Sequence, residues 1–190
     1  MFSMMKRLLS HFPAVITAVI VSVFLLSSGC FGQNIAEESP GQEFSEGFAI
    51  YLTRADISPA QMPVLSHVDI AEQPIIAMND IVTYNSETHE ISITADAVDR
   101  ISSLEVPVSG KSFVVCVDRK VIYWGAFWTP ISSLAFEGIT IWKPLISHES
   151  KIIKLELGYP SSSFYGGEDP RDNEEVMKSL EQAGKLITMP

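Results

Sequence analysis

The chain has 190 residues, a formal net charge of −10 and two cysteines. This length predicts one domain with attached segments. The acidic balance argues against a nucleic-acid partner, because phosphate binding requires a basic surface. It also argues against electrostatic docking onto anionic lipid headgroups. Two cysteines are too few for a disulfide framework, so we expect a packed core to hold the domain together.

The first 30 residues follow the pattern of an export signal. Lys6 and Arg7 provide positive charge, and residues 14–26 form a mostly apolar stretch without any charge. This stretch is shorter than the ~20 residues that a membrane-spanning helix needs, so it predicts the apolar part of a signal peptide. Small residues then lead to Cys30.

The sequence Leu-Leu-Ser-Ser-Gly-Cys, which ends at Cys30, resembles the lipobox of bacterial lipoproteins. In that family the cysteine becomes the acylated first residue of the mature protein. The resemblance therefore implies a lipid anchor at Cys30 and a location on the extracytoplasmic side of the cell membrane. Ser27 stands where the family prefers leucine. There are two alternatives, both with a free thiol at Cys30. In one, the signal peptide is cleaved in the ordinary way, and in the other it stays uncleaved and serves as an anchor.

Changes in composition divide the chain into four parts. Residues 1–29 form the predicted signal peptide, and residues 30–47, rich in Gln, Glu, Ser and Gly, are expected to form a flexible tether. Residues 48–157 carry the strand and helix patterns of one α+β domain. Residues 158–190 predict a linker rich in Ser, Gly and Pro, followed by an exposed helix.

The expected domain is a small mixed or antiparallel sheet with one or two packed helices. Thr94 is a good N-cap for a helix over residues 95–104, because its hydroxyl can accept a backbone N–H of the first turn. Alternating apolar and polar residues predict a hairpin before this helix. The expected strands cover residues 48–53, 74–77, 81–84, 90–94, 113–117, 121–124, 139–142 and 151–157.

The stretch from Lys111 to Lys143 organises the predicted domain. Phe113–Val117 is a continuous apolar run, which is typical of a strand with both faces covered. Val121–Trp124 is expected to pair with it across a turn. That turn lacks the Asn-Gly or Gly-Gly pair that marks the common two-residue hairpin turns, so its type is not assigned.

Five short pieces follow one another along this stretch: Gly110-Lys111, Val117-Asp118, Val121-Ile122-Tyr123, Pro130-Ile131 and Gly138-Ile139. Their order of strands and turns resembles the periplasmic first domain, the P1 head, of the protein-export subunit SecD. The resemblance covers about Phe48–Trp142 and implies an α+β sandwich and a tendency to bind polypeptide. It implies no export activity, and Arg119 stands where the family usually has glycine.

Candidate reactive side chains are few. His67 with Asp69, and His89 with Glu90, are the two pairs considered for metal binding or acid–base catalysis, but their spacing is not specific for either. Cys116 lies inside an apolar strand, where burial makes a thiol unreactive. We found no Gly-x-Ser-x-Gly motif and no phosphate-binding loop. The sequence thus predicts no enzyme, no metal and no cofactor.

The aromatic residues of the central stretch are the strongest candidates for a contact surface. Trp and Tyr are frequent at interfaces because they combine a large apolar area with a polar group. We predict Trp124, Phe127 and Trp128 as binding residues. The alternative is that these rings build the core of a small domain.

These observations favour a non-enzymatic protein or peptide interaction domain, anchored to the membrane through Cys30, with an envelope protein or peptide as its partner. The partner is expected to add a strand to a sheet edge near Trp124–Pro130. A small-molecule-binding lipoprotein with an aromatic pocket is the second hypothesis. An enzyme that uses one of the His–carboxylate pairs is the third.

Overall fold

The computed structural model describes residues 46–64, 66–143 and 149–188. Cys30, the predicted signal peptide and almost all of the predicted tether lie outside the described residues. The described residues form an α+β fold, as the sequence predicted. They contain two α-helices and nine strands, and the strands form two sheets where the sequence predicted one. None of the described helices is long and apolar enough to cross a membrane.

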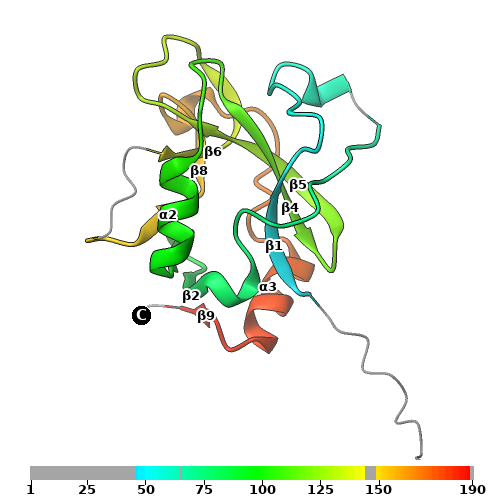
Figure 1. Ribbon diagram of the computed structural model, residues 1–190, viewed down its shortest axis with the longest axis vertical. Helices are drawn as coiled ribbons and strands as arrows, with labels where there is room; N and C mark the ends of the chain where they lie inside the picture. The colour runs from blue at the N-terminus through cyan, green and yellow to red at the C-terminus, as the bar shows by residue number, and fades with distance from the viewer. Residues whose placement is uncertain (1–45, 65, 144–148, 189–190) are drawn as a thin grey trace, which may run out of the picture. The chain divides into compact units, whose positions relative to one another are not determined.

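The larger sheet is built around the central stretch of the sequence (Figure 1). Its strands lie in the order β1-β4-β5-β6-β8, and β5 and β6 run parallel while the other neighbours are antiparallel. The prediction that Phe113–Val117 and Val121–Trp124 pair in the middle of a sheet is confirmed. The strands are β1 (Phe48–Leu52), β4 (Lys111–Val117), β5 (Lys120–Trp128), β6 (Phe136–Trp142) and β8 (Glu156–Tyr159).

The turn between β4 and β5 is a two-residue hairpin turn. Asp118 and Arg119 both have a positive φ, of 49° and 64°, which is the backbone of a type I′ turn. Non-glycine residues adopt this region at a cost. Arg119 has compensating contacts, because its guanidinium lies 5.1 Å from the centre of the Tyr51 ring and 3.8 Å from Glu46. It also donates to the carbonyl oxygen of Glu72 at 3.2 Å.

The smaller sheet contains the predicted hairpin, and its strands lie in the order β7-β3-β2-β9. The prediction of a single strand over residues 151–157 is wrong. Leu155, which is fully buried, separates two short strands. The strand before it pairs in the smaller sheet, and the strand after it pairs in the larger sheet. Leu155 donates its N–H to the carbonyl of His89, which holds the chain as it passes from one sheet to the other. The strands are β2 (Ile81–Asn85), β3 (Glu90–Ile93), β7 (Ile152–Lys154) and β9 (Leu186–Ile187).

Helix α2 (Ala95–Ser103) forms as predicted. The hydroxyl oxygen of Thr94 accepts the N–H of Ala97 at 3.4 Å, which confirms the expected N-cap. Ala97, Val98 and Ile101 form its buried face. Their spacing of three and four residues puts them on one side of the helix.

The C-terminal part is not a linker with an exposed helix, and this prediction is corrected. Helix α3 (Glu174–Gln182) buries Val176 and Leu180 completely in the main core. The hydroxyl of Ser179 accepts the N–H of Phe48 at 2.9 Å, and β9 pairs in parallel with β2. The described residues therefore make one compact unit, and the predicted boundary at residue 157 is too early.

The larger sheet has two faces with different coverings. We call the face that carries Phe113, Val115 and Ile139 the inner face, because these residues share the main core with both helices and with the smaller sheet. The opposite, outer face carries two smaller clusters. One is covered by Met62 of the 3₁₀-helix η1 (Met62–Val64) and by its neighbouring loop.

Candidate binding groove

Side chains of β5 alternate between the two faces of the sheet. Trp124, Ala126 and Trp128 lie on the outer face. Phe127 lies on the inner face, is fully buried, and has its ring centre 5.3 Å from that of Phe113. The structure thus brings two of the three predicted binding residues together, Trp124 and Trp128. Phe127 is a core residue, because side chains of a strand alternate between its faces.

The outer face carries a continuous row of aromatic rings, which we call the aromatic row: Trp124, Phe136, Trp128, Tyr159 and Trp142. Phe136 contacts Trp124 edge-to-face at 5.7 Å and stacks on Trp128 at 5.0 Å between ring centres. The Tyr159 hydroxyl donates to the carbonyl oxygens of Pro130 and Ser132, each at 3.1 Å. This contact ties the loop between β5 and β6 to the row.

Two glycines make room for these rings. A Cβ atom on Gly138 would lie 2.6 Å from the Phe136 ring, and one on Gly110 would lie 2.2 Å from the Trp128 ring. Gly110 also has a φ of +79°, which favours glycine. The pairing of β6 with β8 is irregular between Phe136 and Ile139, so the start of β6 departs from a regular strand where it meets the groove.

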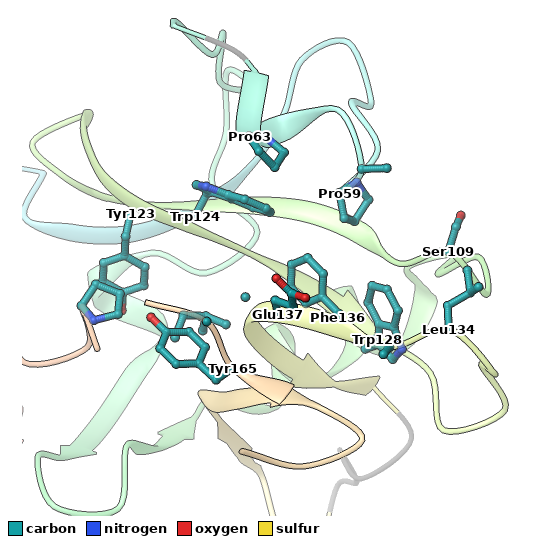
Figure 2. A pocket seen from close by; sticks show the side chains of 16 residues that line it. Pro59, Pro63, Ser109, Tyr123, Trp124, Trp128, Leu134, Phe136, Glu137 and Tyr165 are labelled. Atoms are coloured by element: carbon teal, nitrogen blue, oxygen red, sulfur yellow. The ribbon is translucent and has the colours of Figure 1, made fainter. Parts of the chain in front are cut away.

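A groove of about 630 Å³ runs along three rings of the aromatic row, those of Trp124, Phe136 and Trp128 (Figure 2). We call it the aromatic groove. Its floor comes from β5 and β6, and its sides come from the loop before β2, from the loop after β5 and from the segment after β8. The lining includes Pro59, Pro63, Trp124, Trp128, Leu134, Phe136, Glu137, Tyr165 and Pro170. This volume lies in the range of common ligand sites, about 300–1,000 Å³.

Glu137 is the only charged side chain among the described residues that line the groove. It is exposed, and within the described residues its carboxylate has no ion pair. Its backbone carbonyl accepts the N–H of Gly166 at 3.0 Å, which fixes this end of β6 against the segment after β8. The groove is therefore an apolar, aromatic surface with one carboxylate.

Two side chains of the lining have buried donors without a partner among the described residues. They are the hydroxyl of Tyr123 and the indole N–H of Trp128. Burial raises the pKa of Tyr123 well above its usual value, so this hydroxyl stays protonated and remains a donor. Each unpaired buried donor costs about 1–3 kcal/mol.

A second, polar pocket of about 320 Å³ lies beside His89 and is lined by Lys154 and Arg171. The Nδ1 atom of His89 lies 3.1 Å from the Tyr84 hydroxyl. Burial, with a smaller contribution from Arg171, lowers the pKa of His89. Arg171 itself is engaged, because it binds Asp169 through two nitrogen atoms and the carbonyl of Leu155 at 2.7 Å.

The other sequence candidates stay apart from the groove. His67 and Asp69 form an exposed pair, 3.1 Å between Nε2 and Oδ1. Burial raises the pKa of the Cys116 thiol to about 11, which favours the unreactive form expected from its strand. Over the described parts of the chain, no three His, Cys, Asp or Glu residues converge so that they could hold a metal.

No family model, no curated protein and no solved structure matches this chain. The resemblances to lipoproteins and to SecD therefore stay predictions. Sequence reasoning missed Glu137 and the groove walls at Pro59 and Tyr165. For Glu137 a local pattern could have indicated a place in the groove, because this residue stands between an aromatic residue and a glycine. Pro59 and Tyr165 gave none, because only the folded chain brings them together.

Proposed function

We propose that this protein is a membrane-anchored, extracytoplasmic binding protein that holds a segment of a partner polypeptide in the aromatic groove. The leader and the lipobox-like sequence at Cys30 support the anchor. The aromatic groove carries the proposal for binding. Its Trp and Tyr residues are of the types that dominate binding energy at interfaces.

The apolar surface continues beyond the groove, which favours a polypeptide over a compact ligand. Leu134 is 51% exposed, and its neighbour in the same loop, Ile131, is 81% exposed. Val108, 53% exposed, lies beside them, because the Ser132 hydroxyl donates to its carbonyl. Exposed apolar residues that gather in one place mark interaction surfaces more often than residues scattered singly.

The mode of binding differs from the sequence expectation. The region Trp124–Pro130 offers no free edge over residues 125–127, because β5 pairs there with β4 on one side and with β6 on the other. The groove instead presents side chains. Aromatic grooves suit extended, proline-rich segments, whose polyproline II conformation leaves backbone carbonyls free to accept hydrogen bonds.

The anchor is tested by intact mass and membrane fractionation of the wild type beside Cys30→Ser. A lipoprotein shows a mass increase of two or three acyl chains in the membrane fraction, and the variant loses both the increase and the membrane association. A soluble wild type at the mass of the cleaved chain would contradict the anchor. A full-length mass in the membrane for both proteins would indicate an uncleaved leader.

Binding is tested with the full chain in detergent and an eight-residue peptide of proline and leucine with one central arginine. We expect saturable binding by calorimetry, weakened at least about 20-fold by Trp124→Ala. Trp142→Ala is the matched control, because Trp142 belongs to the aromatic row but does not line the groove. Equal losses in both variants, or no binding by the wild type, would contradict the proposal.

A small-molecule site is the second candidate, and the volume of the groove favours it. The matched probe is the capped dipeptide of proline and leucine. Equal affinity for the dipeptide and the eight-residue peptide would show that the groove recognises a compact ligand. We expect the longer peptide to bind more tightly, since Leu134 and the exposed loop residues offer it further contacts.

A further inference from the structure

We propose that the segment held in the aromatic groove carries a lysine or arginine side chain, whose cation lies against Trp124 and Phe136 and pairs with Glu137. This inference rests on the proposed function, because it names the chemistry of the occupant of the same groove. Four observations carry it: the single charge of the groove, the arrangement of its rings, a matching arrangement elsewhere in the fold, and the shortage of other polar groups.

The charge of the groove is complementary to a cation. Glu137 lies among apolar and aromatic side chains, with no ion-pair partner in the described part of the chain. Figure 2 shows its carboxylate in the middle of the groove, with Trp124, Phe136 and Tyr165 around it. An occupant that displaces water from these rings lowers the local dielectric constant and strengthens the attraction between the carboxylate and a cation.

The rings beside Glu137 suit a cation as well. Trp124 and Phe136 meet at an interplanar angle of 60° with their centres 5.7 Å apart. Two rings at this angle present a face and an edge, and the negative face of each ring attracts a cation. Tryptophan is the strongest of the aromatic residues in this interaction. The aliphatic stem of lysine or arginine would cover the remaining apolar surface.

The fold already contains this combination within its own chain. The Arg119 guanidinium lies 5.1 Å from the centre of the Tyr51 ring and 3.8 Å from the Glu46 carboxylate. Ring, cation and carboxylate are all present there. In the groove, the rings and the carboxylate are present and the described residues provide no cation.

Other occupants fit the groove less well. A sugar has many hydroxyl groups, and the polar side-chain atoms of the lining are few. They belong to Glu137, to Ser109, to the two tyrosines and to the indole N–H groups of the two tryptophans. The Tyr165 hydroxyl is already engaged, because it donates to the carbonyl of Glu168 at 2.6 Å. An acidic segment would place like charges together near Glu137. The net charge of −10 also favours the approach of a basic partner.

The test uses three capped eight-residue peptides of proline and leucine that differ at one central position, which is arginine, citrulline or glutamate. Citrulline has nearly the shape of arginine without its charge. Calorimetry on the full chain in detergent measures the dissociation constants. We expect the arginine peptide to bind about tenfold more tightly than the citrulline peptide, and the glutamate peptide to bind most weakly.

Variants of Glu137 separate this inference from the proposed function. In Glu137→Gln the preference for arginine should fall to about twofold or less, while the affinity for the citrulline peptide stays unchanged. In Glu137→Lys the order of the arginine and glutamate peptides should reverse. Glu168→Gln is the matched control. This exposed acid lies near the groove but does not line it, and its loss should leave the preference intact.

Three results would overturn the inference. If the wild type binds all three peptides equally and Trp124→Ala weakens all of them, the groove binds polypeptide without reading charge, and the proposed function stands. The inference also fails, and the proposed function stands, if Glu168→Gln removes the preference for arginine as fully as Glu137→Gln does. A general acidic field would then explain that preference. If no peptide binds at millimolar concentration, both the inference and the proposed function fail.

Discussion

Both faces of the larger sheet carry aromatic rings, but the rings are covered in different ways. On the inner face, Phe113 and Phe127 are fully buried with residues of both helices and of the smaller sheet. On the outer face, Trp124 and Phe136 keep partial exposure, because mostly loops border them. The same class of residue therefore builds the core on one face and remains available for contact on the other.

The rings compared above also differ in their polar groups. The inner-face phenylalanines have none, whereas the outer-face tryptophans each carry an indole N–H. Within the described residues, the N–H groups of Trp128 and Trp142 have no hydrogen-bond partner. The main core has one such donor as well, the Tyr123 hydroxyl. Unpaired donors therefore occur on both sides of the sheet, and the partial exposure of Trp124 and Phe136 is what distinguishes the outer face.

The largest expected effect on stability comes from the inner face. Phe127→Ala removes a fully buried ring and leaves a cavity, so we expect the free energy of unfolding to fall by about 3–5 kcal/mol. Urea denaturation followed by circular dichroism measures it. Trp124→Ala is the comparison, since its ring is partly exposed. An equal loss for both variants would remove the distinction between the faces.

Helix α3 belongs to the covering of the inner face, and Leu180→Ala tests this. Leu180 is fully buried in the main core, so we expect a loss of about 2–5 kcal/mol in the free energy of unfolding. Glu181→Ala, one residue further along on the exposed side, should change it by less than about 0.5 kcal/mol. A loss below about 1 kcal/mol for Leu180→Ala would mean that α3 contributes little to the core.

Local patterns predicted the parts of the fold that depend on near neighbours. The apolar run Phe113–Val117 marked a central strand, and Thr94 marked the start of α2. The period of a strand could also have separated Phe127 from its neighbours Trp124 and Trp128, because positions 124 and 128 share a face that position 127 does not.

Other features depend on contacts between distant segments. Val176 and Leu180 have the spacing of any amphipathic helix, and only the packing of α3 on the main core distinguishes a buried stripe from an exposed one. The change of sheet at Leu155 interrupts a run that reads as one strand. The groove itself joins Pro59 and Tyr165 across more than half of the described chain, and no local pattern encodes such a meeting.

Burial of His89 predicts a pH dependence of stability. Its pKa is lowered in the folded state, so at a pH between the folded value and the ordinary value of 6.5 the unfolded chain binds more protons. The stabilisation is fully present above pH 6.5 and is lost as pH falls through the folded pKa. Arg171 and Lys154 oppose the charged form, whereas Asp172 and Asp169 favour it.

The urea midpoint at pH 7.5, 6.5 and 5.5 measures this effect. The wild type should lose stability over this range, and His89→Asn should lose less, because asparagine does not titrate and tolerates the positive φ of 53° at this position. His67→Asn is the control, since the His67 side chain is 81% exposed. Parallel curves for the wild type and His89→Asn would show that His89 does not cause the pH dependence.

The smallest expected effect on stability belongs to the loop beside the groove. Ile131 is 81% exposed, so Ile131→Ser should change the free energy of unfolding by less than about 0.5 kcal/mol. If the contact surface continues from the groove onto this loop, the same change weakens a long peptide and spares a short one. Peptides of eight and four residues, measured by calorimetry, compare the two.

Val82→Ser is the matched control for this last change. Val82 is 52% exposed on β2, in the smaller sheet, and does not line the groove. The Val82→Ser change should leave the affinities for both peptides unchanged. If Ile131→Ser weakens neither peptide, the contact surface ends at Leu134. The outer face would then be a bounded groove, which would strengthen the case for a compact ligand over a polypeptide.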